Sequence, residues 1–248
     1  MNITPIKTHQ ITQKDSDIIS VVDQYILDLS ENSILVITSK IVAIAQGRIV
    51  PMDEKTDKDV LIANESQWYL PRSENKYNVS MTITRNTLVA SAGIDESNGD
   101  GYYILWPEDP QKVANTIREY LKNKFSLKHI GVLITDSRTT PMRWGVTALS
   151  IAFSGFMPLK DYIGKPDIFG RDMVHTKMSI VDNLSCAAAL VMGEGSEQTP
   201  MAIVTEVPFV EFVDRNPTEE ELKGLQIEPD EDLYAPLLKS VKWLRGKK

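Results

Sequence analysis

An α+β fold with two closely packed lobes of mixed sheet and helices is the architecture that this sequence predicts. Short apolar runs that suit buried strands are mixed with segments of helical periodicity, and the regular strand–helix–strand repeat of a parallel α/β protein is lacking. The 248 residues are enough for one large domain or two intimate lobes. A hydrophobic content of 42% and a charged content of 25% are those of an ordinary globular chain with a large core.

In the first half of the chain, apolar residues at helical spacing predict a helix within 15–29. The apolar run 33–38 predicts a buried strand, and 39–45 predicts a short helix or a turn directly after it. Residues 79–84 and 88–91 predict two further strands, and the polar residues between them suit the turn of a hairpin.

In the second half, an Asp-Pro pair followed by apolar residues at helical spacing predicts a helix over 110–124. The apolar runs 130–135 and 201–205 predict two more buried strands. A helix is expected to begin at Asp182 and to end near Gly193, and a terminal amphipathic helix is expected over 232–244.

The stretch 136–199 is rich in Gly, Pro, Met and Ser, and two apolar strands bracket it. We therefore expect a single unit, 1–248, with two lobes. Residues 1–135 together with 200–248 would form a core lobe, and 136–199 an inserted lobe.

Charge and composition exclude several classes of protein. The 27 Lys and Arg against 34 Asp and Glu give a net charge of −7, which disfavours binding to nucleic acid. No segment approaches the about 20 apolar residues of a membrane-spanning helix, and the N-terminus lacks the pattern of a secretion signal. The single cysteine, Cys186, excludes an intramolecular disulfide and fits a reducing compartment. We expect a cytoplasmic protein with small-molecule substrates, and neither a nucleic-acid nor a membrane partner.

Two segments carry oxygen-rich side chains where strands end. Asp136 and Ser137 follow the strand 130–135, and the loop 92–99 contains Asp95 and Asn98. Carboxylate and hydroxyl oxygens are the ligands that Mg²⁺ and Mn²⁺ prefer, although both segments alone also suit ordinary turns. Arg143 is placed to bind phosphate or carboxylate in a bidentate manner, unless its stem only packs on the protein surface.

The order and spacing of these segments resemble the coenzyme F420-0:L-glutamate ligases, also called F420-0 γ-glutamyl ligases. The likeness covers nearly the whole chain. The segment Ser91-Ala92-Gly93-Ile94-Asp95-Glu96-Ser97-Asn98 is similar to the family's AGID-x-SN loop. The other segments that carry the resemblance are 39–48, 135–145, 160–164, 167–171, 181–182 and 190–195.

The resemblance implies an intertwined homodimer and an amide ligation that uses GTP or ATP with Mg²⁺ or Mn²⁺. The acceptor carboxylate would be activated as an acyl phosphate and joined to L-glutamate. The metal ligands implied by position are Asp95, Asp136 and Ser137. The nucleotide contacts implied by position are Pro5, Ile6, Ser39 and Asn98. From the residue types we add Arg143 beside Asp136 as a catalytic group.

Departures from the family pattern concern the residues that meet phosphate. Ile44 stands where the family has a lysine, so Lys40 is the nearest candidate to replace it. After the strand-end Asp-Ser/Thr, the family often has Asn-Gly-Arg or Phe-Gly-Arg, and Arg138 is the candidate to take the role of that arginine. The segment 207–214 lacks the glycines of the family's nucleotide loop. We interpret these changes as altered substrates, with an F420-0-like or folate acceptor. The alternatives are a non-catalytic nucleotide- or cofactor-binding protein of the same fold and a metal-dependent phosphohydrolase that uses Asp95 and Asp136.

Overall fold

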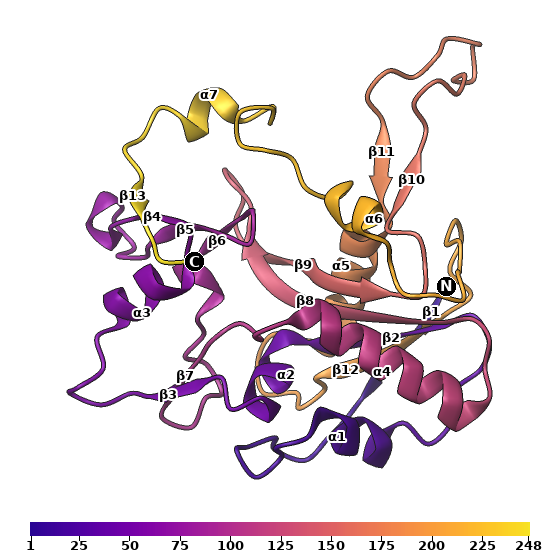
Figure 1. The fold of residues 1–248 in the computed structure, drawn as a ribbon, viewed down its shortest axis with the longest axis horizontal. Coiled ribbons are helices and arrows are strands. Elements are labelled where there is room, and N and C mark those ends of the chain that lie inside the picture. The colour runs from indigo at the N-terminus through magenta and orange to yellow at the C-terminus, as the bar shows by residue number, and fades with distance from the viewer.

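A five-stranded sheet in the order β1-β12-β2-β8-β9 forms the centre of the computed structural model, which describes all residues from 1 to 248 (Figure 1). Its strands are β1 (Asn2–Ile6), β12 (Met201–Thr205), β2 (Ser33–Thr38), β8 (Ile130–Thr139) and β9 (Val146–Ser154). Only β2 and β8 are parallel, and their register pairs Thr38 with Thr135. The carboxyl ends of both strands therefore meet at one edge of the sheet.

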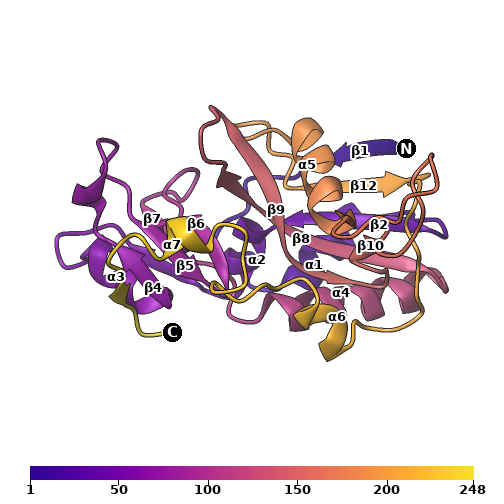
Figure 2. The same ribbon diagram turned by 90° about the horizontal axis from the view of Figure 1, so that it is seen from above.

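Helices cover both faces of this main sheet. The helices α1 (Ile18–Tyr25), α2 (Ser39–Ala45) and α4 (Pro110–Phe125) pack on one face, and α5 (Ile180–Met192) packs on the other (Figure 2). In β2, Leu35 and Ile37 join the first core cluster, while Ile34 and Val36 join the second. Burial on both faces explains why this strand is continuously apolar, as the sequence predicted.

A second sheet, β13-β4-β5-β6, lies to one side of the main sheet (Figure 1). Its strands are β4 (Trp68–Leu70), β5 (Met81–Thr84), β6 (Thr87–Ala90) and β13 (Leu244–Arg245), and the helix beside it is α3 (Lys58–Glu65). Arg85 and Asn86 both have positive φ, at 49° and 59°, which is the backbone of the tight turn that matches strand twist. The predicted hairpin is therefore confirmed. A two-stranded ribbon of β3 (Ile49–Pro51) and β7 (Tyr102–Ile104) borders it.

The stretch 136–199 supplies β9 and α5 to the layers of the main sheet, together with a projecting hairpin of β10 (Leu159–Asp161) and β11 (Lys177–Ser179) (Figure 1). The second sheet is built instead by residues 68–90 and 244–245. The polar, glycine-rich composition of 136–199 reflects its exposed loops. The strand β8 runs on through Asp136 because it pairs with β9 as far as Thr139, with one shift of register between Ile134 and Thr135.

The predicted terminal helix over 232–244 is wrong. The structure has only a short helix, α7 (Ala235–Leu238), and then β13. Leu233 and Leu237 are 87% and 66% exposed, so most of the apolar face of this segment lacks tertiary packing. A short helix without tertiary packing is marginal, and the chain pairs Leu244 with Tyr69 of β4 instead.

Residues 207–248, here named the C-terminal strap, connect the two sheets; they also contain the short helix α6 (Glu219–Lys223). At one end, Arg118 of α4 is fully buried and donates to Asp214 Oδ1 at 3.0 Å and Asn216 Oδ1 at 3.2 Å. At the other end, β13 extends the second sheet, and Lys248 lies 3.6 Å from Glu65. The yellow segment in Figure 1 shows this course. None of the helices in the molecule has the length and apolar character needed to cross a bilayer.

The anchoring of the strap leads to a stability prediction. Asp214→Ala removes the carboxylate that Arg118 and Lys122 share, and so leaves a buried guanidinium with fewer acceptors. The midpoint of urea denaturation should fall clearly. Glu219→Ala, which breaks only an exposed ion pair with Lys223, is the control and should leave it unchanged. Equal midpoints for all three proteins would contradict the anchoring role of Asp214.

Candidate active site

The shared edge of β2 and β8 collects most of the predicted site residues. Ser39 begins α2 directly after β2 and is buried, and Lys40 follows it. On the neighbouring strand, Asp136 and Ser137 continue β8 past Thr135. The parallel register thus places the two polar segments side by side, although they are almost one hundred residues apart in sequence.

Asp136 is the most perturbed carboxyl group of the site. Burial raises its pKa to about 6, against the lowering effect of hydrogen bonds from the Trp106 indole, the Ser137 N–H and the Ser39 hydroxyl. The nearby charge of Asp95 raises the pKa further. A carboxylate that is costly to ionise in the free protein is stabilised when a cation reaches it.

Asp95 lies on the loop that follows the 3₁₀ turn Ser91–Gly93, where its backbone pairs with Ile104. Its Oδ2 is 2.8 Å from Lys40 Nζ, and its Oδ1 accepts the Ser97 N–H at 2.7 Å. Burial raises the pKa of Asp95, but the hydrogen bonds and charge of Lys40, with those of Ser97, outweigh it and hold the pKa below its usual value.

Lys40 occupies a cradle of oxygen atoms. Besides the Asp95 carboxylate, its ammonium donates to the Ser97 carbonyl at 2.9 Å and to the Ser97 hydroxyl at 3.0 Å. Three oxygens from one loop thus surround a positive charge. This donor set suits a hard cation.

The loop after α5 closes another side of the site, and sequence reasoning missed its role. The Ser137 hydroxyl donates to Glu194 Oε2 at 2.7 Å, and the Asn98 amide donates to the Gly195 carbonyl at 3.0 Å. One signal was the position of Gly193-Glu194-Gly195 at a helix end. The segment also belongs to the resemblance to the ligase family, but neither signal indicates a contact with Ser137 or Asn98.

The remaining predicted residues lie around this centre at different depths. Arg138 is half-buried on β8 and makes no ion pair or side-chain hydrogen bond, and Arg143 is exposed in the loop after β8 and is likewise unpaired. Ile6 aligns with Met201, which aligns with Ile37, so the end of β1 reaches the same edge two strands away. Pro5 precedes it on β1.

Ile44, at the position of the family's lysine, is buried against Ala43 and Ile104 in a small apolar cluster. It cannot meet phosphate from there. Lys40, by contrast, has its ammonium beside Asp95.

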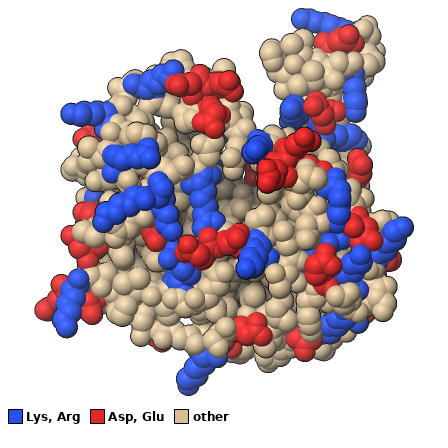
Figure 3. Space-filling model, in the orientation of Figure 1, with Lys and Arg blue, Asp and Glu red and all other residues tan.

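The acidic residues of the site do not form a closed metal cage. No group of three or more His, Cys, Asp or Glu side chains converges anywhere in the molecule. Two carboxylates and a hydroxyl nevertheless fit Mg²⁺, which is usually held by one or two carboxylates together with waters and substrate phosphates. Figure 3 shows acidic and basic side chains interspersed over one face, without a broad basic patch.

The model of the F420-0:gamma-glutamyl ligase family matches residues 5–206 of the chain. The chain belongs to this family. Coenzyme F420:L-glutamate ligase of Methanopyrus kandleri is 31% identical over 221 residues, which are 82% of this chain and 86% of the relative. The enzyme of the same name from Methanothermobacter thermautotrophicus is 32% identical over 209 residues, 77% of this chain and 82% of its own.

A third relative named coenzyme F420:L-glutamate ligase, from Methanosarcina mazei, is 33% identical over 198 residues, 74% of this chain and 77% of its own. The resemblance drawn from the motifs is confirmed, and the protein is an amide-bond-forming ligase. The family match ends at residue 206, so the C-terminal strap lies outside it.

The perturbed Asp136 leads to a pH prediction for the metal-free protein. Its folded pKa of about 6 lies above its ordinary value of 3.8, so the protonated form favours folding, and that contribution is lost as the pH rises through 6. Asp136→Asn should raise the free energy of unfolding by roughly 1–3 kcal/mol at pH 8, and the gain should shrink toward pH 4.

Urea denaturation in the presence of a chelator measures this gain. The exposed Asp28 provides the control, because Asp28→Asn should change nothing at either pH. A destabilised Asp136→Asn protein at pH 8 would contradict the unfavourable burial of this carboxylate.

Proposed function

We propose that this protein is a metal- and NTP-dependent γ-glutamyl ligase that joins L-glutamate to an acceptor carboxylate, either F420-0-like or a folate. The single observation that carries the proposal is the meeting of Asp136, with its raised pKa, and the Lys40-bound Asp95 at the edge of the main sheet. Family membership and the names of the relatives support the class of reaction.

Asp95, Asp136 and Ser137 would hold Mg²⁺ or Mn²⁺. Glu194 accepts the Ser137 hydroxyl and so holds that oxygen beside the two carboxylates. When bound, the divalent ion offsets the charge of the triphosphate and stabilises the transition state of phosphoryl transfer. With that ion in place, Lys40 is free to leave Asp95 for a phosphate oxygen.

The nucleotide, GTP or ATP, would lie along the same edge. Ser39 and Asn98 border the carboxylates. Pro5 and Ile6 end β1, which lies two strand spacings, about 10 Å, from β2 and three from β8. Arg138 is a half-buried cation without a partner, which suits it to hold phosphate or carboxylate. Arg143, farther along the same hairpin, is the second candidate for this contact.

In the proposed reaction, the acceptor is activated before L-glutamate attacks it. An oxygen of the acceptor carboxylate attacks the γ-phosphorus, and the nucleoside diphosphate leaves. The amine of L-glutamate then attacks the acyl carbon of the resulting acyl phosphate, an amide bond forms, the amine gives up a proton, and inorganic phosphate leaves. The protein would orient three anionic substrates, which gives a use to the unpaired charges of Arg138 and Arg143 and to Lys40 once it leaves Asp95.

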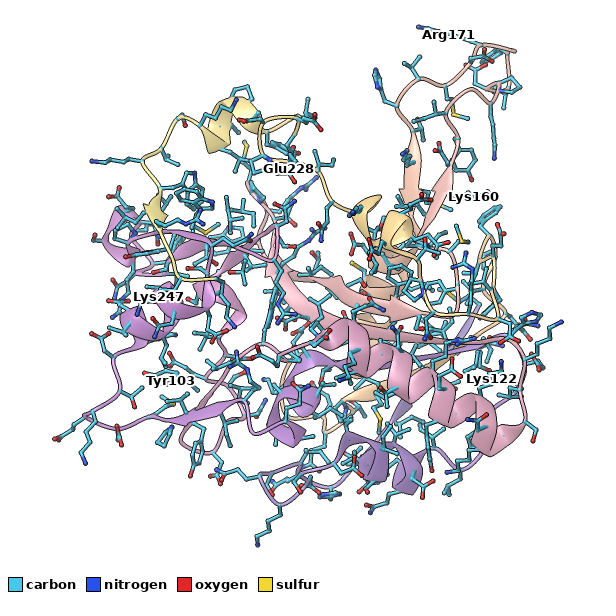
Figure 4. The ribbon with its side chains drawn as sticks, in the orientation of Figure 1. Tyr103, Lys122, Lys160, Arg171, Glu228 and Lys247 are labelled. Atoms are coloured by element: carbon cyan, nitrogen blue, oxygen red, sulfur yellow. The ribbon has the colours of Figure 1, made fainter.

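Projecting apolar side chains support the intertwined homodimer. Ile168 and Phe169 at the tip of the β10–β11 hairpin are 92% and 89% exposed, and Trp144 in the β8–β9 loop is 90% exposed. Figure 4 shows Arg171 near the tip of this hairpin and Lys160 at its base, with the arm standing clear of the body. Such an arm loses its exposed apolar surface when a second copy packs on it.

A charge placed at the hairpin tip tests the dimer. The double variant Ile168→Glu with Phe169→Glu should be monomeric in light scattering coupled to gel filtration, while the unmodified protein is dimeric. Leu27→Glu changes another exposed apolar residue, 79% exposed and outside the arm, and should leave the dimer intact. A monomeric unmodified protein would contradict the dimer.

Mass spectrometry of the acceptor tests the proposed reaction. Purified protein with Mg²⁺ or Mn²⁺, GTP or ATP and L-glutamate should produce an acceptor heavier by one glutamyl residue, for F420-0 or for a folate. Asp136→Ala should abolish ligation, and Asp28→Ala should not.

Other outcomes favour the alternatives. Nucleotide hydrolysis that is independent of glutamate and acceptor would favour a phosphohydrolase, and no turnover with any combination would favour a binding protein. Ligation retained by Asp136→Ala would contradict the metal-ligand role of that residue.

A further inference from the structure

Trp106 is an aromatic side chain that hydrogen-bonds a carboxylate of the candidate active site. It follows β7, is 4% exposed and packs on Val89 and Leu149. Its indole Nε1–H donates to Oδ2 of Asp136. The ring is thus held by apolar packing, while its single polar atom points at a carboxylate from a different part of the chain.

Gly93 leaves the space that this indole needs. A Cβ at residue 93 would lie 2.1 Å from Trp106 Nε1 and 2.4 Å from Cε2, and the glycine has a φ of +73°. Gly93 is two residues before Asp95. The indole therefore touches the loop of one carboxylate and hydrogen-bonds the other.

Arg48 fixes the backbone from which the indole projects. Its Nε donates to the Trp106 carbonyl at 3.1 Å, and its Nη2 donates to Glu65 Oε2 at 2.6 Å. The Leu105 N–H in turn donates to the Arg48 carbonyl at 2.9 Å. Trp106 is thus held at its backbone, its ring and its N–H.

We propose that Trp106 is a positioning residue for the cation site. By holding Oδ2, the indole fixes the plane of the Asp136 carboxylate and the direction of Oδ1, and its contact with Gly93 sets the Asp95 loop against that carboxylate. Groups that orient metal ligands in this way typically change metal affinity 10- to 100-fold when they are removed. The inference rests on the proposed function, because it assigns Trp106 to the cation site proposed there.

Trp106→Phe removes the N–H and keeps the aromatic packing. The affinity for Mn²⁺ alone, measured from free Mn²⁺ by electron paramagnetic resonance, should fall about 10-fold or more. The denaturation midpoint and the KM for L-glutamate should stay near those of the unmodified protein. Trp243→Phe is the matched control, because that indole donates only to the Leu238 carbonyl on the strap.

Two glycine variants test the same contact without changing the indole. Gly93→Ala should weaken Mn²⁺ binding to a similar degree, because the new methyl group displaces the ring. Gly101→Ala carries the same backbone strain, with a φ of +83°, but meets nothing within 4 Å, and should bind Mn²⁺ normally. Equal affinities for the two variants would contradict the role of the Gly93–Trp106 contact.

The indole N–H resonances of ¹⁵N-tryptophan-labelled, metal-free protein report the hydrogen bond directly. Of the four tryptophan signals, the one lost in Trp106→Phe should also move in Asp136→Asn. An unmoved signal, or unchanged Mn²⁺ affinity in Trp106→Phe, would overturn the positioning role alone. Unmodified protein that binds no Mn²⁺ at all would contradict the proposed function itself.

Discussion

The parallel pairing of β2 with β8 is the constraint on which the rest of the structure depends. Both strands are buried on both faces, so their register is fixed by two core clusters at once. That register carries Ser39 and Asp136 to one edge of the sheet. A slip of one residue would turn Asp136 to the opposite face, toward α5 and away from Trp106, and would separate it from the Asp95 loop.

Electrostatics explain how an acidic protein could bind the anionic substrates proposed for it. The net charge of −7 includes the carboxylates that would hold a cation, and one of them, Asp136, is costly to ionise without one. Lys40 already balances Asp95 in the free protein, and Arg138 remains without a partner. A cation bound by these carboxylates would reverse the sign of the charge locally, although the chain as a whole stays acidic.

Local patterns were sufficient for the elements that bury apolar surface. The strands at 33–38, 130–135 and 201–205 are where the sequence predicts them, because a short, continuous apolar run is typical of a strand buried on both faces. The helix predicted over 232–244 is wrong, since most of its apolar residues stay exposed. Periodicity alone does not reveal whether a partner surface exists.

The site was only partly predictable, because some of its contacts join residues that lie far apart in the sequence. A motif signals each of Asp95, Asp136 and Ser137, and the last two directly follow the apolar run 130–135. Trp106 contacts Asp136, 30 residues away in the sequence, and Glu194 contacts Ser137, 57 residues away. Both contacts depend on how the segments after β7 and α5 pack against β8. No local pattern encodes such contacts. Their partners can be found only after the sheet has been assembled.

A crystal structure of the protein with Mn²⁺ and a non-hydrolysable GTP analogue tests the central claim most directly. The account predicts an ion bound by the carboxylates of both Asp95 and Asp136, with Lys40 moved from Asp95 to a phosphate oxygen. An ion bound elsewhere, or Lys40 still paired with Asp95 beside a bound nucleotide, would contradict it.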